Sequence, residues 1–219
     1  TNSNFLWTKN IVHVAGGADA AQQNFFDGVL NNLKTRDEDS AYFGANVHSF
    51  FKTSGDPVYV PTGHELDSLL DHGTSLLTFY GHSAASTFDY QLPFPEDMQN
   101  DYGKYPMFYT NGCLVGDVFQ NTRTLADRYI MTEGKGVIGF LGSDFFGIDG
   151  PLQTYATSFY KNLCTDYYNQ PIGDLVKKNI DDLNHPHSNG SNRSTFQQII
   201  LNMDPSLRLM TTTRPDYDI

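Results

Sequence analysis

The sequence has few cysteines, few basic residues and no long apolar run, and each shortage excludes a class of protein. Two cysteines, Cys113 and Cys164, are too few for a disulfide framework, and neither has the C-x-x-C neighbour of a metal site. With 14 Lys and Arg against 25 Asp and Glu, the net charge of −11 argues against binding to nucleic acid or to an anionic membrane. No apolar run approaches the roughly 18 residues of a membrane span.

The composition is instead rich in aromatic and uncharged polar residues. Among 219 residues there are 13 Tyr, 16 Phe and 19 Gly, whereas only 18% of residues are charged. This blend is commoner in exported proteins than in cytosolic ones. We expect one domain over 1–212, and we interpret 213–219, within the proline-containing ending "TTTRPDYDI", as a linker toward a further module of the same parent chain.

Short apolar runs alternate with segments of helical period. This pattern predicts a three-layer α/β/α fold, with about six mostly parallel strands and helices on both faces of the sheet. The strand candidates are 11–15, 46–51, 75–81, 106–110, 136–142 and 206–210. The helical stripes are 66–70 behind a Thr62-x-x-Glu65 capping box, 152–163, 172–183 and 196–203. The long loop 86–105 leaves the carboxyl end of a strand, where ligands bind in open α/β sheets.

Two interpretations compete for the stretch "LLTFYGHSAAS" at 76–86. One is the G-x-S-x-G nucleophile elbow, with Ser83 as the attacking hydroxyl, which makes a serine hydrolase a minor alternative. An elbow needs a helix directly after the serine, but the residues that follow contain two prolines and have no helical period. The other interpretation is a buried strand that delivers His82 to its carboxyl end.

A cysteine follows the next predicted strand. The run "PMFYT" continues through Asn111 and Gly112 to Cys113, and neighbouring strands lie about 4.8 Å apart, so a thiol and an imidazole are expected at one edge of the sheet. An adjacent histidine lowers the pKa of a thiol and protonates the leaving amine, while the thiolate attacks the carbonyl. The segment "CLVGDVF" is expected to begin a helix. Cys164 lies among the apolar positions of a helix and is expected in the core.

At these residues the sequence resembles the gingipain family of cysteine peptidases, in the clan that also holds caspases. The family signature is an apolar block ending in His-Gly and a second block ending in the catalytic cysteine. Here the blocks are "LLTFYGHS" and "MFYTNGC", 31 residues apart. The segments "WTKNIVHVAGG" and "NMDPSLRL" look most like the branch that contains the type IX secretion sortase. The resemblance implies a caspase-like fold and a cysteine endopeptidase, or a sortase-like transpeptidase, that forms an acyl-enzyme.

The resemblance also implies roles for particular residues. His82 would be the general acid/base and Cys113 the nucleophile, with the backbone N–H groups of Ser83 and Cys113 as the oxyanion hole. Ser83 stands where the family usually has glycine, so a Cβ crowds the carbonyl oxygen. This departure keeps a second interpretation open, namely a catalytically inactive caspase-like domain with a peptide-binding or structural role.

Substrate, partners and location follow from the same resemblance. The implied pocket residues are Gly17, Asp19, Ser143 and Asp144. The two aspartates would favour a basic or polar P1 side chain, unless they are solvated helix caps. The implied partners are a polypeptide substrate, flanking domains and outer-membrane secretion machinery, for a secreted or surface-associated protein. No cofactor is required. Gingipains bind calcium, but the acids here lack EF-hand-like spacing.

Overall fold

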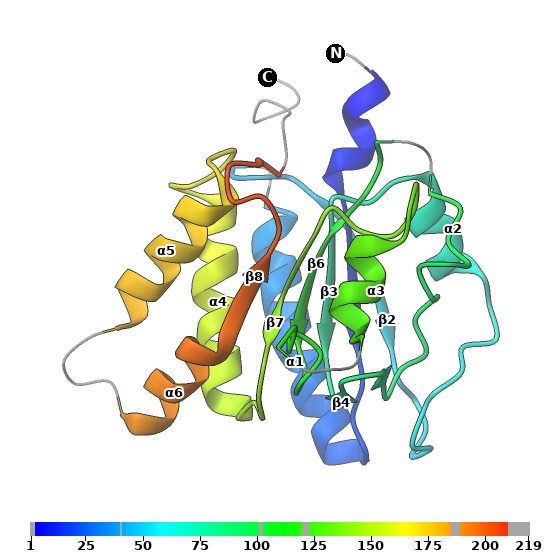
Figure 1. Cartoon of the computed structure of the whole chain (residues 1–219), viewed down its shortest axis with the longest axis horizontal. Helices are drawn as coiled ribbons and strands as arrows, with labels where there is room; N and C mark the ends of the chain where they lie inside the picture. Colours follow the sequence, from blue (N-terminus) through cyan, green and yellow to red (C-terminus); the bar gives the residue numbers. More distant parts are fainter. Residues whose placement is uncertain (1–2, 40, 101–102, 120–122, 185–188, 210–219) are drawn as a thin grey trace.

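The computed structural model describes residues 3–209 except 40, 101–102, 120–122 and 185–188. Its middle layer is a six-stranded sheet with the order β2-β1-β3-β6-β7-β8 (Figure 1). The strands are β1 (Asn10–Ala15), β2 (Asn46–Phe51), β3 (Leu76–Tyr80), β6 (Met107–Asn111), β7 (Gly139–Ser143) and β8 (Ile199–Asn202). All neighbours are parallel except β7 and β8, which confirms the predicted mostly parallel sheet.

Helices cover both faces of the sheet (Figure 1). One face is covered by α1 (Ala20–Asp37), α4 (Asp149–Cys164) and α6 (Gly190–Gln198), with α5 (Ile172–Leu183) packed against α4, and the other by α2 (Glu65–His72) and α3 (Leu125–Met131). Successive side chains of a strand point to opposite faces. Ile11 therefore packs in the hydrophobic core between the sheet and α1, and Val12 in the core between the sheet and α2. The chain enters the sheet through a 3₁₀ helix, η1 (Ser3–Lys9). No helix in the described ranges is long and apolar enough to cross a membrane.

The sixth strand is not the predicted one. Within 206–209 the described chain makes a single bridge, between Arg208 and Pro171, and Met210 lies outside the described residues. The sheet is completed by β8, whose Ile199 and Ile200 were expected on a helix. Both residues are β-branched and suit a strand, and β8 covers the edge of β7 that would otherwise lack a partner.

The two ends of α2 and the domain boundary at 212 can be compared with the sequence predictions. The capping box at Thr62 is wrong, because α2 begins after His64, which makes no side-chain cap hydrogen bond. Gly73 ends α2 with a φ of 118°, as expected of a glycine stop. The predicted linker 213–219 lies outside the described residues, so the domain boundary at 212 stays a prediction.

Candidate active site

The ends of β3 and β6 bring His82 and Cys113 to one edge of the sheet. The two strands are parallel neighbours, and each of their paired residues is 31 positions apart. The same offset, continued past the strand ends, matches Gly81 with Gly112 and His82 with Cys113. Gly112 permits the close approach, because a Cβ there would lie 2.1 Å from the Oγ of Ser83.

The imidazole of His82 is held by α1. Its Nε2 lies 2.7 Å from the Oε1 of Gln22, and its ring meets the ring of Phe26 edge to face, at 5.9 Å between centroids. The N–H of Ala18 donates to the same Oε1 at 3.0 Å, so Gln22 offers an acceptor and His82 must donate from Nε2. Nδ1 is then the basic nitrogen of a neutral imidazole.

Gln22 was missed by sequence reasoning, although a signal for its position exists. Asp19 caps α1 by accepting the N–H groups of Ala21 and Gln22, at 2.9 and 3.0 Å. An aspartate followed three residues later by glutamine is a capping-box pattern, which marks a helix start. That start, directly after β1, would have placed Gln22 at the carboxyl edge of the sheet.

Cys113 lies in a tight loop, so the predicted helix at this position is wrong. Leu114 has a φ of 63°, in the left-handed region, and its N–H donates to the carbonyl of Phe145 at 3.1 Å. The N–H of Gly147 donates to the Sγ of Cys113 at 3.3 Å. These bonds run to the loop after β7 instead of along a helix. Among the hydrogen bonds of the described residues, none joins the thiol to His82.

Ser83 begins a hairpin and not a helix. The hairpin pairs β4 (Ser83–Ala84) with β5 (Thr87–Phe88), so the helix that a serine elbow requires does not follow. The Oγ of Ser83 donates to the carbonyl of Cys113 at 2.8 Å. Since the N–H of Asp89 donates to the carbonyl of His82 at 2.9 Å, Ser83 and Phe88 form a non-hydrogen-bonded pair. The N–H of Ser83 therefore points away from β5.

The two pocket candidates after β1, Gly17 and Asp19, make hydrogen bonds within the fold. Gly17 has a φ of 122° and donates its N–H to the Oδ2 of Asp89 at 2.7 Å. Asp89 is buried and also lies 3.6 Å from the ammonium of Lys52, so it ties the ends of three strands together. Asp19 serves as the cap of α1, which was the alternative given for it above.

The two pocket candidates after β7, Ser143 and Asp144, differ in their exposure. Ser143 is fully buried and its Oγ donates to the carbonyl of Phe145 at 3.0 Å, so it fastens the loop and does not face a substrate. Asp144 is half-buried, and burial, reinforced by the charge of Asp117, raises the pKa of its carboxyl. Within the described ranges, no group of three or more His, Cys, Asp and Glu side chains is arranged to hold a metal ion.

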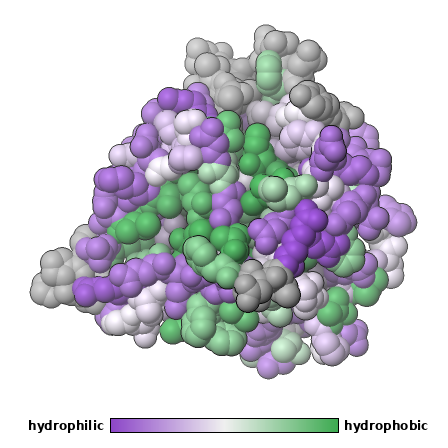
Figure 2. Space-filling view, in the orientation of Figure 1, coloured by the Kyte–Doolittle hydropathy of each residue, from purple (hydrophilic) through white to green (hydrophobic). Residues whose placement is uncertain are grey.

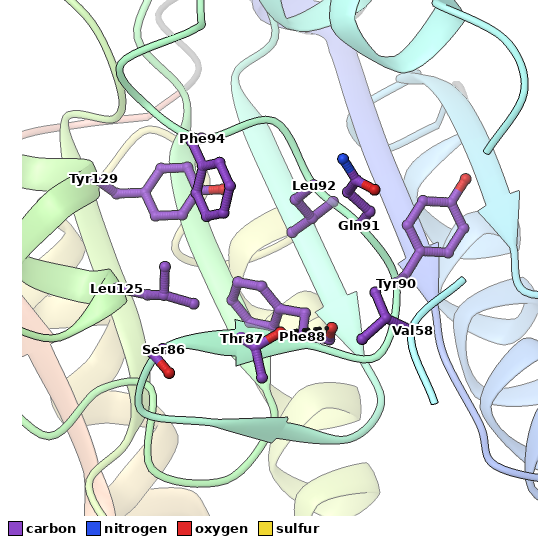
Figure 3. Close-up of a pocket in the computed structure, with 10 residues that line it drawn as sticks. All are labelled: Val58, Ser86, Thr87, Phe88, Tyr90, Gln91, Leu92, Phe94, Leu125 and Tyr129. Carbon is purple, nitrogen blue, oxygen red and sulfur yellow. Dashed lines mark hydrogen bonds between the residues drawn. The ribbon is translucent and has the colours of Figure 1, made fainter. Parts of the chain in front are cut away.

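A separate apolar cavity of about 290 Å³ lies on the α3 side of the hairpin (Figure 3). Most of its walls come from the loop that follows His82, and the rings of Phe88, Phe94 and Tyr129 line it. Its full lining is Val58, Ser86, Thr87, Phe88, Tyr90, Gln91, Leu92, Phe94, Leu125 and Tyr129. None of these residues belongs to the loop of Cys113 or to the loop after β7, although Thr87 and Phe88 belong to the hairpin that begins at Ser83.

Comparisons with known proteins bear on the family and the fold of the chain. A family model described as Peptidase family C25 matches residues 1–210. No curated protein sequence matches the chain. The crystal structure of the Arg-specific cysteine proteinase gingipain R (RgpB) is similar with a TM-score of 0.63 and 14% identity, over 94% of this chain and 48% of that one.

Two further structures extend the comparison. A complex of the pro- and mature domains of RgpB from Porphyromonas gingivalis gives a TM-score of 0.65 at 14% identity, over 94% of this chain and 49% of that one. Caspase-1 from Spodoptera frugiperda gives 0.57 at 12% identity, over 95% and 90%. At such identities the likeness shows the fold. The chain spans about half the length of the gingipain structures that it matches.

Proposed function

Because the chain belongs to peptidase family C25, whose members are cysteine peptidases, we propose that it cleaves peptide bonds through the thiol of Cys113 and the imidazole of His82. The observation that carries this proposal is the shared register of β3 and β6, which ends both strands at one edge. The thiolate attacks the scissile carbonyl, and the imidazole passes a proton to the leaving amine. Water releases the acyl group in a hydrolase, whereas an amine accepts it in a transpeptidase.

Two backbone N–H groups support an oxyanion hole. The N–H of Ser83 points away from β5, on a hairpin whose first residue bonds to the carbonyl of Cys113. With the N–H of Cys113 it can stabilise the negative oxygen of the tetrahedral intermediate. The side chain of Ser83 has a different task in this scheme, because its Oγ holds the two loops together.

Gln22 supports the scheme as a positioning residue. Its amide oxygen accepts from Nε2 of His82 and leaves Nδ1 as the nitrogen that can take the proton of the thiol. An amide that fixes the tautomer and the orientation of a histidine is the third part of such nucleophile and base arrangements.

Replacing Gln22 with alanine is expected to lower kcat about 10- to 100-fold, with KM changed much less, because the imidazole loses its orientation and not the substrate site. Gln22→Glu keeps an acceptor at the same position and is expected to recover most of the activity. Steady-state kinetics on a fluorogenic peptide measures both variants. Equal activity of Gln22→Ala and the unmodified chain would show that α1 does not position His82.

Ser83→Ala is expected to reduce kcat no more than about tenfold, because the backbone N–H remains and only one hydrogen bond to the Cys113 loop is lost. Ser83→Gly tests whether the Cβ itself slows the reaction, and it is expected to match or exceed the alanine variant. Complete loss of activity in Ser83→Ala, with the fold intact by circular dichroism, would restore the serine-hydrolase alternative.

A second candidate function is a domain that binds peptide without cleaving it. The observation that favours it is the hydrogen bonding of the pair, since His82 contacts Gln22 and Cys113 accepts from Gly147. Active-site hydrogen bonds are often long or misaligned without substrate, so we propose the active enzyme first. A role beside flanking domains and outer-membrane secretion machinery, as in the sortase branch, stays a prediction of the sequence resemblance.

A further inference from the structure

We propose that the substrate carries large apolar side chains next to the scissile bond, and that these pack on four exposed residues around the site. We call this set the apolar rim: Phe25, Phe145, Phe146 and Ile148. The inference rests on the peptidase function proposed above, and it replaces the basic or polar P1 side chain expected from the sequence.

Three rim residues lie in the loop that touches the nucleophile. The carbonyl of Phe145 accepts the N–H of Leu114, and the N–H of Gly147 donates to the Sγ of Cys113. Phe146 and Ile148 flank Gly147 directly, so their side chains leave the chain one residue from the contact with the thiol. Figure 2 shows apolar surface at the lower edge of the molecule, where β7 ends in Figure 1.

The fourth rim residue comes from the helix that holds His82. Phe25 lies three positions after Gln22 on α1, and its ring meets that of Tyr80 at 6.3 Å between centroids. The hydroxyl of Tyr80 donates to the carbonyl of Asp149 at 2.8 Å, which ties the far end of the β7 loop beside α1. Exposed apolar side chains are therefore carried by two elements that contact the pair, the loop after β7 at the thiol of Cys113 and α1 at His82.

The rim residues are exposed although hydrogen bonds hold the loop that carries three of them in place. Phe145, Phe146 and Ile148 are 54%, 59% and 48% exposed, and Phe25 is 36% exposed. Yet the loop is fastened at both ends, by the buried hydroxyl of Ser143 and by the contact of Gly147 with the thiol. The rings of Phe145 and Phe146 contact each other at 5.0 Å between centroids, and exposed apolar side chains on a fixed backbone favour a binding surface.

The two acids predicted for the pocket, Asp19 and Asp144, both have contacts within the fold. Asp19 is occupied with two backbone N–H groups at the start of α1. Asp144 lies on the β8 side of the loop, where its N–H bonds to the carbonyl of Gln198, and it is partly buried. The cavity of Figure 3 is apolar as well, but its walls do not include the loop of Cys113 or the loop after β7. Three of the rim residues lie in the loop whose Gly147 contacts the thiol.

A matched set of peptides tests this specificity on the whole chain. The peptides differ only in the two residues around the scissile bond. These are Phe and Leu in one peptide, and two Ala, two Arg or two Glu in the others. Mass spectrometry measures kcat/KM for each peptide. We expect the apolar peptides to exceed the Arg and Glu peptides by at least about tenfold. A preference for Arg would overturn the apolar proposal and leave the peptidase function standing.

Rim variants and a binding measurement separate the two proposals. Phe146→Ser is expected to lower kcat/KM about tenfold on the Phe peptide and little on the Ala peptide, whereas Phe5→Ser, a ring of 45% exposure on η1, should change neither. Equal losses on both peptides would contradict the rim. If no peptide is cleaved, the peptidase function fails. The affinity of Cys113→Ala for the Phe and Arg peptides then decides whether the rim binds apolar side chains. Tighter binding of Phe, lost in Phe146→Ser, supports it, and equal binding refutes it.

Discussion

Replacing Cys113 with alanine is expected to abolish peptide cleavage, with a fall in kcat of about 10⁴-fold or more. The reason is that the thiol of Cys113 forms the acyl-enzyme in the proposed scheme, and alanine supplies no nucleophile in its place. His82→Ala is expected to cost a similar factor, because a thiol and its base act as a unit. For the same reason the double variant should be no slower than either single variant, which kinetics under single-turnover conditions can measure.

The other cysteine provides the control. Cys164 is fully buried on α4, and its thiol donates to the carboxyl of Asp37 at 2.9 Å. Cys164→Ser keeps a donor at that position and is expected to leave kcat unchanged. Activity retained by Cys113→Ala, or lost in Cys164→Ser while the fold is intact, would refute the assignment of the nucleophile.

The second large effect concerns stability at acidic pH. His13 is fully buried on β1, and burial, with a smaller contribution from the charge of Lys34, lowers the pKa of His13 from 6.5 to about 3. Between these two values the unfolded chain binds a proton that the folded chain does not, so the free energy of unfolding falls as the pH falls. The full slope is about 1.4 kcal/mol per pH unit, so this costs about 2 kcal/mol between pH 6.5 and 4.5, and about 5 kcal/mol in full.

A variant without the imidazole isolates this contribution. His13 lies 3.0 Å from the hydroxyl of Tyr160, and His13→Gln keeps a polar group there without titrating. Urea unfolding at several pH values should show the unmodified chain losing about 2 kcal/mol more than His13→Gln between pH 6.5 and 4.5. Parallel curves for the two proteins would contradict the prediction.

Asp37 gives a control of opposite sign. Burial raises the pKa of Asp37 well above its ordinary value, so its contribution is fully present at low pH and is lost as the pH rises through the folded-state pKa. Asp37→Asn should therefore make the loss of stability at low pH steeper, whereas His13→Gln makes it shallower. The two groups belong to one buried network, so the comparison is best made with each variant alone.

The meeting of His82 and Cys113 was predictable from the sequence because it depends on local signals. Two continuous apolar blocks predict buried neighbouring strands, and parallel strands end at the same edge. The register of β3 and β6 confirms that step. The catalytic roles of the two residues remain a prediction that the experiments above decide.

The parts that were missed depend on contacts between distant segments. The helix α1 was not predicted, because its residues are on average slightly polar. Its buried residues, Phe26, Val29, Leu30 and Leu33, nevertheless recur at helical spacing. The loop at Cys113 is not helical because it bonds to the loop after β7, about 30 residues later in the chain, and no local propensity encodes that bond. The contact of Gln22 with His82 was missed because the two residues lie 60 positions apart, although the capping-box pattern marks the helix start that carries Gln22.

The most direct test of the account is the pH dependence of alkylation at Cys113. Iodoacetamide modification of this residue is followed by peptide mass spectrometry in the unmodified chain and in His82→Ala. An unperturbed exposed thiol slows about tenfold per pH unit below its ordinary pKa of about 8.5. We predict that Cys113 of the unmodified chain stays reactive at pH 6 and that His82→Ala follows the ordinary thiol. If both proteins follow the ordinary thiol, the pair of Cys113 and His82 is not an activated nucleophile and base.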